Sequence, residues 1–208
     1  MTGSVVKVIG AGGAEISAAD MVIAAKNAGH DLKPFHKKAA ELLCHYDGPA
    51  RLMAHLLLVH DAAYRLLDRM SSAWAELKLN RELVLFGAAV HDIGKVVCTR
   101  ELSKEGHEHE LAGKELLLKL GIPEDMARFA DTHALWSERS TTEELLVSLA
   151  DKIWKGSRVQ ELEDLLVTRI AEVTGRERWD VFSALDSIIG DIAADEDWRL
   201  AWQKQFSV

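Results

Sequence analysis

Proline is scarce in this chain, and so are segments in which polar and apolar residues alternate. The three prolines among 208 residues are Pro34, Pro49 and Pro123. Alternation is typical of half-buried strands, whereas the abundant alanine, leucine, glutamate and lysine favour helices. The composition therefore predicts an all-α protein.

Cysteines are also few, and long apolar runs are absent. Cys44 and Cys98 form no Cys-x-x-Cys pair, so we expect reduced, buried thiols and a cytoplasmic protein. No run approaches the ~20 apolar residues needed to span a bilayer, so no membrane association is expected. The N-terminus lacks a basic start followed by an apolar stretch, and we therefore expect no signal peptide.

Positive charge is in deficit, because the formal net charge is −8. This balance argues against a broad basic surface for nucleic acids. It remains compatible with a small phosphorylated ligand, since metal ions and one or two cations reverse the field locally.

Local signals divide the chain into helices. Ser17 is a predicted N-cap with Asp20 three residues later, Asn80 and Thr141 or Thr142 are further caps, and Gly121 closes a segment. The predicted helices span residues 17–28, 35–46, 49–75, 80–98, 107–120, 123–136, 142–155, 159–174, 177–193 and 195–205.

The dipeptide His-Asp occurs three times, and its context differs at each place. Residues 30–31 follow a glycine at a predicted helix end, and residues 60–61 lie in mid-helix. Residues 91–92 follow the apolar run 83–90, where a histidine and a carboxylate are costly to bury unless they are paired or coordinated. Zinc, iron and manganese accept both ligand types, so residues 91–92 are a candidate metal site.

Lys95 lies three residues after Asp92 and four after His91, on the same face of the predicted helix. Two interpretations fit this spacing. Lys95 holds a substrate phosphate beside a metal, or it forms a salt bridge with Asp92.

Four more positions extend the pattern. They are His55 with Val59 at +4 and Ala63 at +8, His109 in HELAG, His133 in ADTHALW and Asp151 in LLVSLADKIW. Together with the HDIGK segment at 91–95, this order resembles the HD superfamily of metal-dependent phosphohydrolases, over residues 48–155.

The resemblance implies a fold, a site and a reaction. The fold would be an HD-domain helical bundle, and the reaction would be hydrolysis of a phosphoester or phosphoanhydride by metal-activated water. The implied ligands of one or two divalent ions (Mn, Fe, Zn or Co) are His55, His91, Asp92, His109, His133 and Asp151. Four of them suit one ion. His109 and His133 either hold a second ion, bridged by Asp92, or contact the substrate. Asp92 and Lys95 are the implied catalytic residues, with Lys95 also binding substrate.

The substrate class and two alternatives also follow from the resemblance. The segment from His133 to Trp154 is similar to the end of bacterial HD diadenosine tetraphosphate hydrolases, so we expect a small phosphorylated substrate of the nucleotide or dinucleotide class. The GYP signature of the related cyclic-di-GMP phosphodiesterases is absent. A di-iron oxygenase has the same six-ligand order, and a non-catalytic nucleotide-binding sensor would keep the same residues.

The remaining features are assigned to packing and to the substrate rim. We expect one domain, in which residues 1–47 and 156–208 pack on a metal-binding core at 48–155. His60 is assigned to the core or its flank. Trp179, Trp198 and Trp202 are expected to pack the core. Candidate phosphate contacts that the sequence does not rank are Arg100, Lys104, Lys114, Arg139, Lys152, Lys155 and Arg158.

Overall fold

The structure is a computed structural model that describes residues 8–9, 15–43, 46 and 48–207. Cys44 and most of the predicted N-terminal lead lie outside these residues. In the described part, two short antiparallel strands, β1 (Val8–Ile9) and β2 (Glu15–Ile16), accompany an array of helices. The predicted all-α class is confirmed.

The α-helices follow the predicted order closely. Their bounds are α1 Ala18–Asn27, α2 Lys37–Leu43, α3 Ala50–Ala73, α4 Arg81–Val90, α5 Glu108–Lys119, α6 Glu124–Ala127, α7 Phe129–Thr132, α8 Thr142–Ile153, α9 Gln160–Thr174, α10 Arg178–Ala193 and α11 Glu196–Gln203. Among these described helices, none combines the length and the hydropathy that crossing a bilayer requires.

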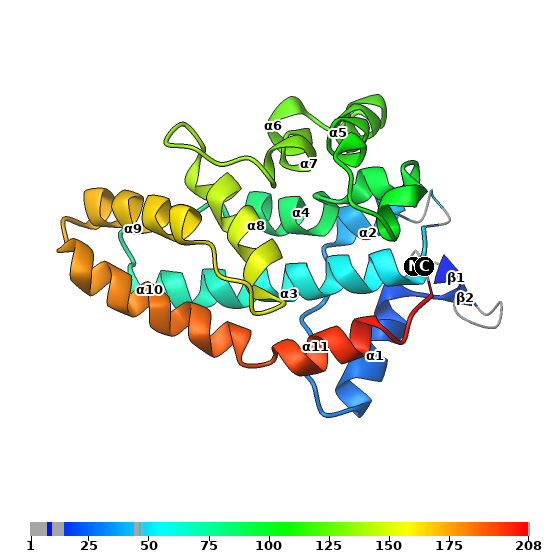
Figure 1. Cartoon of the computed structure of the whole chain (residues 1–208), viewed down its shortest axis with the longest axis horizontal. Coiled ribbons are helices and arrows are strands. Elements are labelled where there is room, and N and C mark those ends of the chain that lie inside the picture. Colours follow the sequence, from blue (N-terminus) through cyan, green and yellow to red (C-terminus); the bar gives the residue numbers. More distant parts are fainter. Residues whose placement is uncertain (1–7, 10–14, 44–45, 47, 208) are drawn as a thin grey trace.

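Helix α3 is the centre of the arrangement (Figure 1). Helices α4 and α8 pack on α3 and on each other, while α1, α10 and α11 also contact it. Helices α5, α6 and α7 pack together beside α4, and α9 runs along α8 and α10. The core is therefore built around α3, which is buried along most of its length.

The predicted helix caps are confirmed by hydrogen bonds. The Ser17 hydroxyl accepts from the Asp20 amide at 3.0 Å, and the Asn80 side chain accepts from the Leu83 amide at 3.1 Å. Thr141 forms a capping box with Glu144 at the start of α8. These contacts satisfy amides that have no partner inside the helix, so the boundaries follow from local chemistry.

Two predicted helices are broken, and the first break lies at the predicted ligands His91 and Asp92. The helix predicted at 80–98 ends at Val90, and the chain continues through a turn into the short 3-10 helices η1 (Ile93–Val96) and η2 (Thr99–Leu102). The helix predicted at 123–136 becomes α6 and α7. Helix α7 packs on α4. The ring of Phe129 lies against Gly87, where the Cβ of any other residue would overlap it.

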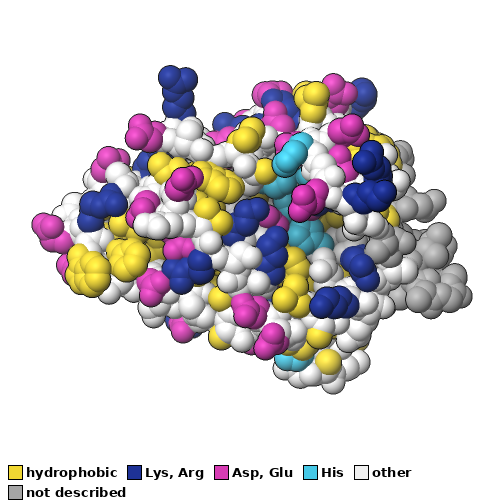
Figure 2. Space-filling model, viewed as in Figure 1, with side chains coloured by type: hydrophobic (Ala, Val, Ile, Leu, Met, Phe, Trp, Pro, Cys, Tyr) yellow, Lys and Arg dark blue, Asp and Glu magenta, His cyan; other side chains and the backbone are white. Residues whose placement is uncertain are grey.

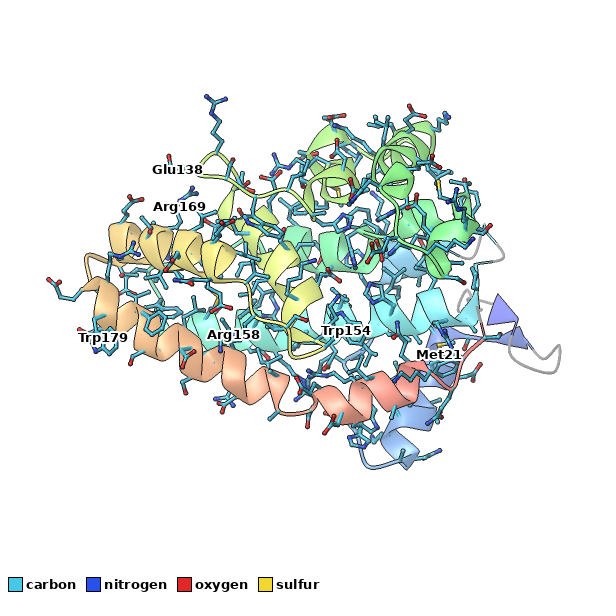
Figure 3. All side chains as sticks on the ribbon, viewed as in Figure 1. Met21, Glu138, Trp154, Arg158, Arg169 and Trp179 are labelled. Atoms are coloured by element: carbon cyan, nitrogen blue, oxygen red, sulfur yellow. The ribbon has the colours of Figure 1, made fainter. Side chains whose placement is uncertain are left out.

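The three C-terminal tryptophans have different environments. Trp202 is buried and Trp198 is half-buried, with its ring stacked on His30 at 3.8 Å between centroids. The prediction for Trp179 was wrong, because its side chain is 72% exposed and stacks on Phe182. Trp179 lies in the first turn of α10, at the opposite end of the helical array from Met21 (Figure 3).

The His60-Asp61 dipeptide in the middle of α3 is buried in the helix packing. Asp61 is buried, accepts hydrogen bonds from the Lys33 amide at 3.1 Å and from Arg65 at 2.7 Å, and lies 3.7 Å from the buried guanidinium of Arg199. A buried carboxylate is costly when it loses its cationic partners. Asp61 therefore connects α11 and the segment after α1 to the central helix.

His60, the other half of that dipeptide, is buried with no hydrogen-bond partner at either ring nitrogen. Burial, helped by the charges of His36 and Arg81, lowers the pKa of His60 to about 3, from an ordinary value of 6.5. Between these two values the unfolded chain binds a proton that the folded protein does not. Above pH 6.5 this group therefore does not lower the free energy of unfolding. As the pH falls below 6.5, the free energy of unfolding decreases.

We predict that His60→Leu makes stability less sensitive to acid. Through this group the wild type loses about 2 kcal/mol of unfolding free energy between pH 6.5 and 5. The variant lacks the imidazole and would not show this loss. Urea unfolding of both proteins at pH 7 and pH 5 measures the difference. An identical loss of stability in the two proteins would contradict the prediction.

Candidate metal centre

The six predicted ligands come from five different elements and lie together. His55 is on α3, His91 and Asp92 form the turn after α4, and Asp151 is in the last turn of α8. His109 is near the start of α5 and His133 directly follows α7. Their ligand atoms form two groups, His55 with His91 and Asp151, and Asp92 with His109 and His133, each within 4.8 Å.

Two glycines bring the turn at residues 91–92 against α5. A Cβ on Gly94 would overlap the carbonyl oxygen of His109 and the amide nitrogen of Gly113. A Cβ on Gly113 would lie 3.0 Å from the Gly94 nitrogen. This backbone contact is possible only because neither residue has a side chain. The glycines of HDIGK and HELAG therefore bring Asp92 next to His109.

Asp92 lies between the two groups of ligands. Its Oδ1 is 3.0 Å from His109 Nε2 and 3.5 Å from His133 Nε2. Its Oδ2 is 3.1 Å from His55 Nε2. Asp151 Oδ1 is 3.6 Å from Nε2 of both His55 and His91. One carboxylate thus presents an oxygen to each group, which is the arrangement expected of a bridging ligand.

Hydrogen bonds on the outer side of the rings determine how the histidines face the centre. His91 Nδ1 is 3.0 Å from the Ala88 carbonyl oxygen, and His133 Nδ1 is 3.0 Å from the Ala130 carbonyl oxygen. A carbonyl only accepts, so each Nδ1 carries the hydrogen and donates it. The Nε2 of a neutral ring then presents a lone pair to the centre, as a metal ligand does.

The protonation states at neutral pH leave the centre rich in electron-pair donors. Burial lowers the pKa of His133 to about 4 and also lowers the pKa of His55. Burial alone would raise the pKa of Asp92, but the surrounding histidines hold this pKa well below its usual range, and the same holds for Asp151. Both carboxylates are therefore ionised, while His133 is neutral.

The donor set fits one or two divalent cations. Carboxylate oxygens face imidazole nitrogens here at 3.0–3.6 Å, and the negative charge is costly to bury unless protons or metal ions balance it. His109 Nε2 is buried and has no properly aligned hydrogen-bond partner. Imidazole nitrogens with carboxylate oxygens are suitable ligands for zinc, iron, manganese or cobalt. The ligand role of each residue stays a prediction that this geometry supports.

Two lysines lie at the edge of the centre. Lys95 Nζ is 2.6 Å from Asp92 Oδ2, so the predicted salt bridge is present. Lys152 Nζ is 2.8 Å from Asp151 Oδ2. Each ammonium group therefore contacts one of the two carboxylates, and each side chain is 22% exposed. Figure 2 shows histidine side chains on this face, with lysine or arginine side chains next to them.

The structure also separates the seven basic residues that the sequence did not rank. Arg158 forms hydrogen bonds to Glu163 and Asp186, and Lys114 is paired with Glu124 and Asp131. These partners already use the charges of both side chains.

Lys152, a member of that set, donates a hydrogen bond to the predicted ligand Asp151. Lys155 lies one turn of chain further, near the ring of Trp154, and its charge contributes to the low pKa of Asp151.

Comparison with known families supports the predicted relationship. Residues 52–154 match the family model described as HD domain. This segment is an HD domain. The predicted resemblance over residues 48–155 is therefore confirmed, and the HD domain places it in a superfamily of metal-dependent phosphohydrolases.

One relative is similar to part of this chain. It is an uncharacterized protein of Methanocaldococcus jannaschii, 28% identical over 131 residues, and the match covers 55% of this chain and 73% of that protein. Its name states no activity. No solved structure gives a significant match to the chain.

Sequence reasoning missed one residue of the centre, Glu101 in η2. Its Oε2 is 2.5 Å from His109 Nδ1, and the side chain is 7% exposed. The contact spans eight residues of irregular chain, where helical periodicity predicts no neighbours. The available sequence signal was a single carboxylate shortly before the HELAG segment, which is too common to be informative.

We predict that Gly94→Ala damages the centre more than any glycine substitution on the outside of the bundle. The new methyl group would separate η1 from α5, at a cost of about 1–3 kcal/mol in unfolding free energy, and would weaken metal binding. Gly190→Ala in α10 is the matched control, because a Cβ there meets nothing within 4 Å. Chemical denaturation and metal titration of both variants test this; equal behaviour would refute the role of the glycine contact.

Proposed function

We propose that this protein hydrolyses a phosphoester or phosphoanhydride bond in a small phosphorylated substrate, of the nucleotide or dinucleotide class. The observation that carries the proposal is the position of Asp92, with one carboxylate oxygen facing His109 and His133 and the other facing His55. A ligand set of this kind supports two metal positions that share one carboxylate.

The chemistry of the proposed reaction requires such a centre. When bound, divalent ions lower the pKa of a coordinated water and offset charge on phosphoryl oxygens. The residues of the chain hold the ligand atoms in place before substrate arrives, because each element that carries a ligand packs on another such element. Pre-organised sites avoid the free-energy cost of arranging polar groups during the reaction.

The lysines favour an anionic substrate. Lys95 and Lys152 place ammonium groups beside Asp92 and Asp151, and Lys155 adds a third cation. In the protein as described, the carboxylates use this charge. Neutralisation of the carboxylates by metal would free both lysines to donate to phosphate oxygens. Two cations at separate edges suit a substrate with more than one phosphate, as in a nucleoside polyphosphate or a dinucleotide.

We predict that metal-stripped protein regains hydrolysis when manganese, iron, cobalt or zinc is added, and that Asp92→Asn abolishes it. The isosteric amide keeps the volume of the side chain but removes the charge that both metal positions need. Products from nucleotides, dinucleotide polyphosphates and simple phosphoesters would be separated by anion-exchange chromatography, since symmetric cleavage of a dinucleotide releases no inorganic phosphate. Asp191→Asn, at a surface ion pair of α10, is the control.

Circular dichroism of the Asp92→Asn variant separates catalysis from folding, and we expect an unchanged helical spectrum because the apolar packing of α3, α4 and α8 is kept. Turnover by the variant equal to that of the wild type would refute the proposal. Iron-dependent oxygen consumption without hydrolysis would favour the di-iron oxygenase, and tight nucleotide binding without turnover under any metal would favour the sensor.

We predict a narrower effect for Lys152→Ala. Loss of one charged hydrogen bond to a phosphate would raise KM about tenfold, with metal content unchanged. Lys119→Ala on the outer face of α5, where the side chain is 76% exposed, should leave KM unaltered. Steady-state kinetics with the best substrate of the panel decide the matter, and an unchanged KM for Lys152→Ala would remove this lysine from the substrate site.

A further inference from the structure

The outer hydrogen bond of His109 differs in kind from those of His91 and His133. The latter two follow helices, and each donates Nδ1–H to the carbonyl oxygen three residues earlier. His109 is the second residue of α5. The carbonyl three residues before it belongs to Gly106, which precedes the helix, so the same local partner is not offered.

Glu101 takes the place of that carbonyl. Its Oε2 lies 2.5 Å from His109 Nδ1 and 3.3 Å from the His109 amide nitrogen, while Oε1 accepts from the Glu108 amide at 3.0 Å. The carboxylate therefore caps the first turn of α5 and orients the His109 ring at once. Such a network restricts the side chain to a single position.

The loop before α5 leaves room for this carboxylate. A Cβ on Gly106 would overlap the carboxyl group of Glu101. The side chain of Glu101 is 7% exposed, so solvent has little direct access to its carboxylate. The loop at Gly106 thus leaves space for the Glu101 carboxylate, and the carboxylate oxygens contact the His109 ring and two backbone amides.

We propose that Glu101 is a positioning residue that selectively controls the metal position formed by Asp92, His109 and His133. The inference rests on the two-metal centre of the proposed function. A carboxylate acceptor at Nδ1 directs the Nε2 lone pair towards Asp92 Oδ1, 3.0 Å away, and makes the ring a stronger ligand. The group of His55, His91 and Asp151 has no contact with Glu101, so its affinity would not depend on this residue.

The test is metal binding by the full chain, without any assay of activity. Metal-free protein is titrated with zinc or cobalt by competition with a chromophoric chelator, and cobalt absorption reports the ligand environment at each step. We expect two ions in the wild type. Loss of an outer hydrogen-bond partner weakens metal affinity by 10- to 100-fold, so Glu101→Ala would weaken the second position by about 100-fold. Glu101→Gln, which keeps an oxygen acceptor, would weaken it by about tenfold.

Further variants separate positioning from folding. Gly106→Ala would displace the carboxylate without removing it and should reproduce the effect of Glu101→Ala. Glu105→Ala, an exposed carboxylate in the same loop, should bind as the wild type does. A purely structural role of Glu101 would lower the melting temperature of the metal-free protein and weaken both positions alike, and this would overturn the inference.

The outcomes also distinguish this inference from the proposed function. Two ions bound with unchanged affinities in Glu101→Ala would overturn the role of Glu101 and leave the two-metal centre intact. A wild type that binds fewer than two ions would overturn both.

Discussion

The buried carboxylate of Asp92 imposes the main constraint on this molecule. It lies 3% exposed between two groups of histidines, and the surrounding rings hold its pKa well below the usual range although burial alone would raise it. An ionised group in such a place needs compensating charge. Part of this positive charge comes from Lys95, whose Nζ lies 2.6 Å from Asp92. The convergent histidines could hold a metal ion that supplies the rest.

The fold meets this constraint through close packing of short elements. Helices α3, α4 and α8 form a rigid apolar base that carries His55 and Asp151. The turn after α4 then approaches α5 so closely that a side chain at residue 94 would overlap the α5 backbone, and one at residue 113 would be tightly crowded. Rigid backbone contacts of this kind hold ligand atoms in place better than flexible loops do.

Much of the fold and of the site was predictable, for identifiable reasons. Helix ends at Ser17, Asn80 and Thr141 depend on hydrogen bonds between residues three apart, so sequence contains the necessary information. His91 and Asp92 could be selected because polar residues inside an apolar helix are costly to bury, whereas the full set of six ligand candidates came from the resemblance to the HD superfamily. By contrast, Trp179 was misassigned, since hydrophobicity indicates that a side chain favours burial and not that a neighbouring element exists to cover it.

By itself, the sequence determined the helical class, the caps, the HD domain and the six residues that converge, because each depends on local periodicity or on a motif order. Only the tertiary structure decided that the helix predicted at 80–98 breaks at the predicted ligands, that Asp92 faces both groups, that Lys152 is paired with Asp151 and that Glu101 contacts His109. These features depend on contacts between separate elements. Their geometry is set by backbone approach and burial, which no spacing along the chain specifies.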